Sequence, residues 1–299
     1  MLDKKRIKIG IAPIGWTNDD LPELGGEIPF ERCIREMAEA GYMGSEVGNK
    51  YPKDPVVLKK ALAPYKLSIA TAWYSTYFTS QDDPTPTIEE FKKHMLFLKA
   101  MGAKVVIVAE CGNGIQGQME TPILERKPTL DNAGWDKLVN GLHAVGKIAL
   151  ENKMRIVYHH HMGTVVQSRR DVDTLMAMTD PNLVWLLADS GHMYFSGGDP
   201  VALFRDHANR IAHVHLKDIR APVLEKVKKE KLSFLKAVKA GVFTVPGDGA
   251  IDFKPIAKEL EQMNYEGWLL VEAEQDPAKA NPLAYAKQAR AYVKQVFRL

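Results

Sequence analysis

The chain has 299 residues, of which 45% are hydrophobic and 26% are charged, a composition typical of a globular protein with a large core. Its 40 basic and 37 acidic side chains leave a net charge of only +3, which argues against a nucleic-acid-binding surface with its strong basic excess. No apolar run reaches the roughly 18 residues of a membrane span and no signal peptide is recognisable, so we expect a cytoplasmic protein with Cys33 and Cys111 as free thiols.

Short apolar segments alternate with amphipathic segments along the whole chain. The apolar segments predict eight strands, which begin at about residues 6, 44, 67, 104, 155, 183, 211 and 267. The amphipathic segments predict helices at 29–44, 54–65, 87–101, 135–152, 169–178, 200–209, 253–263 and 282–297. Asp54 and Asp199 are expected to cap two of these helices, and Thr87 with Glu90 forms a capping-box pattern.

Eight β/α repeats predict an α/β fold in which 1–299 form a single (β/α)8 TIM barrel. A doubly wound open sheet is the alternative, but no glycine-rich phosphate loop follows the first strand. Two long connections interrupt the repeats, at about 111–132 after the fourth strand and at about 219–250 after the seventh. The lysine-rich run 223–241 could bind an anion, although the solvated face of a short helix explains it better.

Histidines collect where three neighbouring strands are expected to end. Six of the nine in the chain lie there: His159, His160, His161, His192, His213 and His215. A single histidine at a strand end is usually structural, but six on one rim are hard to explain in that way. Side chains alternate along a strand, so one face of 211–218 carries His213, His215 and Lys217.

Carboxylates end two of the apolar strands, Asp189 the sixth and Glu272 the eighth, where an unpaired charge would be costly. One group from each of four neighbouring strands gives a mixed imidazole and carboxylate set: His159 or His161, Asp189, His215 and Glu272. Such a set suits a divalent first-row ion such as Mn²⁺ or Co²⁺, and it does not firmly exclude Zn²⁺ or Mg²⁺. The alternative is an ion-pair network with Lys217 and Arg220, to which neutral histidines would add nothing.

Other polar and aromatic side chains also follow predicted strands and could face the same mouth: Trp16, Thr17, Glu46, Trp73, Tyr74 and Glu110. Glu46 is the most suggestive, because it is a carboxylate in a short apolar context. Trp16 and Trp73 could stack on a ring-shaped, polyhydroxylated ligand. The alternative for each of these side chains is packing at the rim.

These strand-end residues resemble the xylose-isomerase-like barrel superfamily in the pattern Asp189-x-Gly-His192, His213-x-His215-x-Lys217-Asp218 and Glu272. Within it, five stretches look like the inosose dehydratases of myo-inositol catabolism: 10–19 (GIAPIGWTND), 44–52 (GSEVGNKYP), 158–164 (YHHHMGT), 242–249 (VFTVPGDG) and 272–277 (EAEQDP). The resemblance covers essentially the whole chain. The superfamily pattern is specific only for the fold, whereas GWTNDD and EAEQDP are much more specific.

The resemblance implies a hydro-lyase that dehydrates 2-keto-myo-inositol (scyllo-inosose) to a trihydroxycyclohexane-1,2-dione. It implies Mn²⁺ or Co²⁺ and, in some members, glutathione as cofactors. Asp189, His215 and Glu272 match the metal positions, and His159 takes a position where many relatives have glutamate, with His161 as its rival. The substrate contacts that we expect are Trp16, Thr17, Trp73, His161, Lys217 and Glu274.

Dehydration requires removal of a proton next to a ketone and loss of hydroxide from the next carbon. Glu272 or Glu46 could be the base, and His192 or Lys217 the acid. A sugar isomerase or epimerase and a non-catalytic polyol-binding protein are the alternatives. A phosphodiesterase of the abasic-site endonuclease type is disfavoured by the balanced charge. The sequence leaves the oligomeric state open and is compatible with a homo-oligomer.

Overall fold

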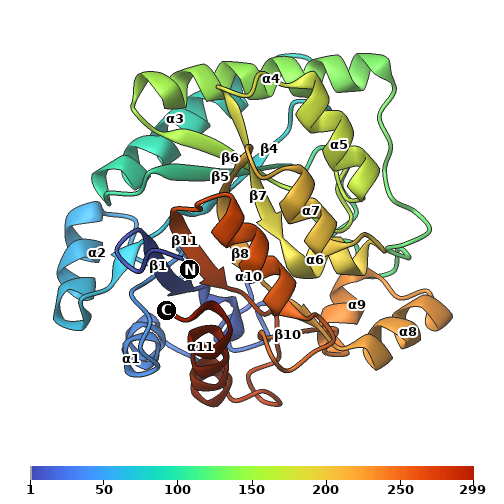
Figure 1. The fold of residues 1–299 in the computed structure, drawn as a ribbon. Helices are drawn as coiled ribbons and strands as arrows, with labels where there is room; N and C mark the ends of the chain where they lie inside the picture. Colours follow the sequence, from blue (N-terminus) through green and yellow to red (C-terminus); the bar gives the residue numbers. More distant parts are fainter. Residues whose placement is uncertain (1) are drawn as a thin grey trace.

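The computed structural model describes residues 2–299, in which parallel strands alternate with helices (Figure 1). The strands are β1 (Ile7–Ile11), β2 (Gly44–Ser45), β3 (Ser68–Ile69), β4 (Trp73–Thr76), β5 (Val105–Glu110), β6 (Arg155–His159), β7 (Val184–Asp189), β8 (Ile211–Leu216), β9 (Asp218–Ile219), β10 (Phe243–Thr244) and β11 (Gly267–Val271). The helices are α1 (Phe30–Glu39), α2 (Pro55–Leu62), α3 (Thr85–Ala100), α4 (Asn132–Glu151), α5 (Arg169–Met178), α6 (Ser190–Phe195), α7 (Pro200–Asp206), α8 (Ala221–Glu230), α9 (Phe234–Lys239), α10 (Phe253–Gln262) and α11 (Pro282–Phe297). Two 3-10 turns are η1 (Pro13–Gly15) and η2 (Ala63–Tyr65).

The main sheet closes into a barrel. Its strand order is β3-β2-β1-β11-β8-β7-β6-β5-β4, so β3 and β4 stand at opposite ends although they follow each other in the chain. Between them, the Thr71 carbonyl accepts a hydrogen bond from Val47 N (3.1 Å), and the Thr71 hydroxyl donates to the Val105 carbonyl (2.9 Å). β3 and β4 are therefore two halves of one barrel strand. The predicted (β/α)8 barrel is confirmed, and the open doubly wound sheet is wrong.

Side-chain alternation divides the strands between an inner and an outer face. Val105, Ile107, Val157 and Leu187 form a small apolar cluster of their own, separate from the large core beneath the helices. These strands are apolar on both faces because a parallel barrel buries both. Two residues further along β6 and β7, the inner face becomes polar. The barrel floor therefore ends where the strand-end histidines and carboxylates begin.

The two long connections pack against the same end of the barrel. In the first, Ile115 N donates to Gly163 O (2.8 Å) and Ile123 N donates to Leu232 O (3.0 Å), which ties it to the β6–α5 loop and to the second connection. The second holds α8 and α9 rather than one helix, because Lys231 adopts a left-handed conformation (φ 52°) and ends α8. None of the described helices is both long and apolar enough to cross a membrane.

Two of the three helix starts predicted from capping residues agree with the structure. The expected caps are confirmed at Asp54 and Asp199, whose side chains accept hydrogen bonds from backbone N–H groups of the first turn. The capping box at Thr87 is wrong. Helix α3 begins two residues earlier, with Pro86 in its first turn, and the Thr87 hydroxyl donates to Gln81 instead (3.0 Å).

Asp218 anchors the end of the second connection, and its replacement by asparagine is expected to destabilise the barrel. The carboxylate is fully buried and accepts hydrogen bonds from four backbone N–H groups, at Ile219 (2.8 Å), Gly247 (3.1 Å), Gly249 (3.1 Å) and Ile251 (2.9 Å). An amide turns one of the two acceptor oxygens into a donor that faces two N–H groups. We expect urea unfolding to show a loss of roughly 2–4 kcal/mol.

The matched control is Asp252→Asn, at the exposed cap of α10, where asparagine replaces aspartate at a cost below about 1 kcal/mol. Equal stability of the two variants would contradict this account of Asp218.

Candidate active site

A cavity of about 800 Å³ opens at the carboxyl ends of the barrel strands. Of the residues that the sequence placed at this mouth, eight line it: Glu46, Trp73, Tyr74, His159, His161, His215, Glu272 and Glu274. The cavity lies where TIM-barrel enzymes place their chemistry. Asp189, His192 and Lys217 are fully buried and lie against its inner residues, in the contacts described next.

Two imidazoles and two carboxylates converge at the inner end of the cavity. Asp189 Oδ2 lies 3.4 Å from His159 Nε2 and 3.3 Å from His215 Nδ1, and Glu272 Oε2 contacts the same His215 nitrogen. None of these four buried atoms has a hydrogen-bond partner. Buried polar atoms without partners are rare in folded proteins, and this set has the composition of a site for a divalent cation.

The charge at this place also fits a cation. Three buried carboxylates, those of Asp189, Glu272 and Glu274, lie within 4.0 Å of one buried ammonium group, that of Lys217. A fourth buried carboxylate, that of Glu46, lies 2.9 Å from His215. Uncompensated buried charge is costly, and a divalent ion would remove most of the negative excess. The ion-pair alternative predicted that Arg220 would join this network. Arg220 instead pairs with Asp248 at 2.9 Å.

Lys217 lies at the centre of a second polar group. Its ammonium donates to Glu274 Oε1 (2.8 Å), lies 3.2 Å from Glu272 Oε1, and is 3.0 Å from His192 Nε2. His161 belongs here rather than beside Asp189, because its ring centre is 4.0 Å from that of His192 and its Nδ1 is hydrogen-bonded to Met162 O (2.8 Å). The structure thus brings His159, and not His161, together with Asp189 and His215.

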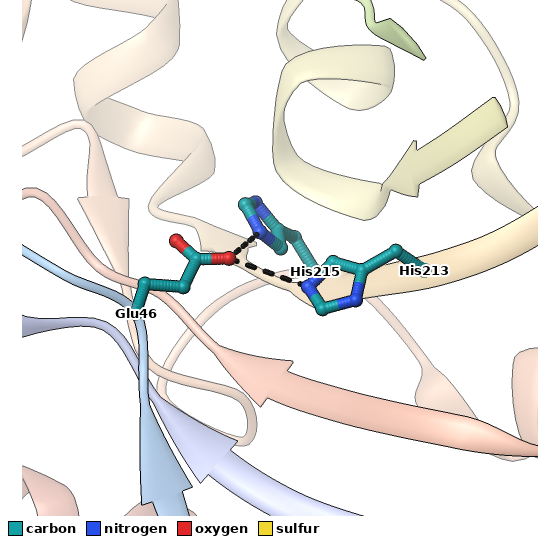
Figure 2. Close-up of side chains that lie close together, drawn as sticks. All are labelled: Glu46, His213 and His215. Carbon is teal, nitrogen blue, oxygen red and sulfur yellow. Dashed lines mark hydrogen bonds and ion pairs between the residues drawn. The ribbon is translucent and has the colours of Figure 1, made fainter. Parts of the chain in front are cut away.

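Glu46 contacts two imidazoles from β8 (Figure 2). Its Oε1 lies 2.9 Å from His215 Nε2 and 3.3 Å from His213 Nε2, and its other oxygen points away from both rings. A carboxylate only accepts hydrogen bonds, so both nitrogens donate. Burial by itself would raise the pKa of Glu46, but the two imidazoles beside it hold the pKa at about 2.

Burial sets the protonation of the remaining groups. It lowers the pKa of His159, and lowers that of His161 to about 3, so both rings are neutral and have a lone pair to offer. Burial would also lower the pKa of Lys217, but the carboxylates of Glu272, Glu274 and Asp189 outweigh it and raise the pKa, which keeps the ammonium charged. Burial raises the pKa of Glu274 to about 7 despite the neighbouring Lys217.

Two predicted substrate contacts do not reach the cavity. Trp16 is only 1% exposed and its indole donates to Glu36 Oε2 (2.7 Å) in α1, while the neighbouring Thr17 is also buried and lies outside the cavity lining of the described chain. Strand alternation does not extend this far, because η1 turns the chain immediately after β1. Asp19 and Asp20 of the same loop line the cavity instead. The paired carboxylates of GWTNDD were the signal for them.

The other strand-end side chains have different roles. Trp73 is 37% exposed and presents its ring at 5.4 Å from those of His159 and His161, where a cyclic ligand could contact it. Glu110 is fully buried and accepts hydrogen bonds from Thr76 Oγ1 (2.8 Å), from both N and Oγ1 of Thr79, and from two further backbone N–H groups. It therefore holds the loop after β4 in place.

Comparison with known proteins places this geometry among relatives. A family model described as xylose isomerase-like TIM barrel matches residues 34–296. Proteins named inosose dehydratase from Geobacillus thermodenitrificans and Clostridium tetani are 58% and 57% identical to the chain over 295 residues, which is 99% of this chain and 99% of each relative. Among solved structures, the IolI protein with a bound zinc atom has a TM-score of 0.71 at 17% identity, over 97% of this chain and 98% of that one.

Proposed function

The chain belongs to the inosose dehydratases of the xylose isomerase-like TIM barrel family, and we propose from this membership that its cavity dehydrates 2-keto-myo-inositol to a trihydroxycyclohexane-1,2-dione. It is an enzyme of the hydro-lyase class. The substrate assignment rests on the 58% identity to an inosose dehydratase over 99% of both chains, which spans nearly the entire barrel. The polar cavity, with Trp73 at its side, suits a ring that carries several hydroxyls.

We propose that His159, Asp189, His215 and Glu272 hold a divalent metal ion, Mn²⁺ or Co²⁺. The support is the set of four buried atoms without hydrogen-bond partners and the excess of buried carboxylates around them. When bound, such an ion supplies Lewis-acid stabilisation of the negative charge that develops on a ketone oxygen. Glutathione is a further cofactor that we propose from the family resemblance, and about 800 Å³ leaves room beyond a single six-membered ring.

Residues in and beside the proposed metal site are the candidates for the base and the acid of the elimination. Glu272 is our candidate base for the proton next to the ketone, because it lines the cavity and lies within 3.2 Å of the Lys217 ammonium. Lys217 is the candidate acid for the departing hydroxide, with His192 as the alternative 3.0 Å from it. Glu274 accepts from Lys217 at 2.8 Å and so orients the ammonium group.

Incubation of the purified protein with scyllo-inosose and Mn²⁺ tests this function. We expect a new ultraviolet absorbance of the dione, together with the mass of a product lighter by one water molecule. A chelator is expected to abolish the reaction and added Mn²⁺ or Co²⁺ to restore it. A product of unchanged mass would point to an epimerase, and tight binding without any product would point to a polyol-binding protein. Either outcome contradicts the proposal.

A further inference from the structure

We propose that Glu46 is a positioning residue, which together with His213 fixes the ring of His215 so that its Nδ1 is free for the metal ion. The inference deepens the proposed metal site and rests on it. The two nitrogens of His215 face opposite partners. Nε2 lies 2.9 Å from Glu46 Oε1 (Figure 2). Nδ1 lies 3.3 Å from Asp189 Oδ2 and contacts Glu272.

The Glu46 contact decides which nitrogen of His215 carries the proton. A neutral imidazole has one N–H group and one lone pair, and a carboxylate cannot donate. The Nε2 proton is therefore the one donated to Glu46, and when a metal ion is bound between His215 and the two carboxylates, Nδ1 is the nitrogen whose lone pair faces it. A carboxylate that accepts from the second nitrogen of a ligating histidine fixes its tautomer and strengthens it as a ligand.

Glu46 is itself held in place from two sides. His213, which precedes His215 by two residues on β8, donates from Nε2 to Glu46 Oε1 at 3.3 Å, the oxygen that also accepts from His215. On the backbone side, the Ser45 hydroxyl donates to the Glu46 carbonyl (2.7 Å) and lies 2.9 Å from the Tyr51 hydroxyl. A carboxylate on a fixed backbone with two imidazole donors has a defined position, which is what orientation of a third group requires.

Glu46, His213 and His215 also resemble a second metal site, since their ligand atoms lie within 4.8 Å of one another. The contacts argue against a second ion. The three atoms that face one another are already paired by hydrogen bonds, whereas the partnerless nitrogen of His215 and oxygens of Asp189 and Glu272 lie on the other side of the His215 ring. The group of Glu46, His213 and His215 is therefore expected to hold no ion of its own.

Titration calorimetry of the metal-free full chain with Mn²⁺ tests the inference. We expect Glu46→Met to bind Mn²⁺ about 10–100-fold more weakly than the unchanged chain, which is the usual effect of removing a side chain that hydrogen-bonds to a metal ligand. The affinity of Glu46→Gln should fall between the two, because its amide oxygen still accepts a hydrogen bond. A base at Glu46 would instead lower turnover equally in both variants and leave Mn²⁺ affinity unchanged. That result would overturn the proposal.

The matched control is Glu36→Gln, a buried carboxylate that accepts from an aromatic ring N–H of Trp16 outside the cavity, and that variant is expected to bind Mn²⁺ like the unchanged chain. His213→Asn leaves Glu46 itself unchanged but removes one of its two imidazole donors, and a smaller loss of affinity is expected for it. If the unchanged chain binds no Mn²⁺, the proposed metal site fails. The contact with Glu46 is then read from nitrogen NMR of the metal-free chain, where a His215 Nε2 without a proton contradicts the positioning role by itself.

Discussion

Replacement of Asp189 by asparagine is expected to weaken Mn²⁺ binding by more than about 10²-fold, because mutation of a residue that only hydrogen-bonds to a metal ligand already lowers metal affinity by about 10–100-fold. Asp189 Oδ2 is the one atom within 3.4 Å of both His159 Nε2 and His215 Nδ1 in the set described above. Its other oxygen caps α6 by accepting from His192 N (2.8 Å), and asparagine keeps that function. The loss should therefore be one of charge and ligation rather than of folding.

Turnover of scyllo-inosose by Asp189→Asn is expected to fall by at least about 10³-fold, since Lewis-acid stabilisation amounts to several kcal/mol and each 1.4 kcal/mol is a factor of ten. Metal content is measured by mass spectrometry of the dialysed protein and turnover by dione absorbance. Asp199→Asn makes the same chemical change at the cap of α7, outside the site, and should behave like the unchanged protein. A fully active, metal-loaded Asp189→Asn enzyme would remove Asp189 from the ligand set.

The second large effect is expected for Lys217→Met. The ammonium lies 2.8 Å from Glu274, 3.2 Å from Glu272 and 4.0 Å from Asp189, and its side chain is fully buried. Without it, turnover should fall by about 10²–10⁴-fold through loss of the acid. The free energy of unfolding should fall by roughly 3–5 kcal/mol, because buried carboxylates lose their counter-charge.

Mn²⁺ affinity separates Lys217 from the metal ligands. Removal of a positive charge near Asp189 and Glu272 should leave binding of a cation unchanged or tighter, the opposite of the effect at Asp189. Calorimetry at a temperature where the variant is folded measures this difference. Lys127→Met is the control. Lys127 lies outside the cavity lining and pairs with Asp171 at 3.1 Å, so this variant should lose no turnover. Turnover of Lys217→Met within a few-fold of the unchanged enzyme would rule out Lys217 as the acid.

Much of the barrel could be predicted because its strands carry strong local signals. The run of apolar residues at 105–109 and the capped helix starts at Asp54 and Asp199 depend on neighbours in the chain, and these features appear where they were expected. The capping box at Thr87 failed because a proline in the first turn favoured an earlier start. The division of the third barrel strand into β3 and β4 had no local signal, since it depends on pairing with β2 on one side and β5 on the other.

The candidate site also has features that the sequence predicts and features that depend on tertiary packing. Strand periodicity was enough to predict that His159, Asp189, His215 and Glu272 come to one end of the barrel, because side chains alternate along a strand with a period of two residues. Only the tertiary structure separated His159 from His161, turned Trp16 into the core, and set Glu46 against His215. These outcomes depend on which side chains meet across strands far apart in the chain. That is decided by packing and by the pairing of buried charges, which local sequence does not contain.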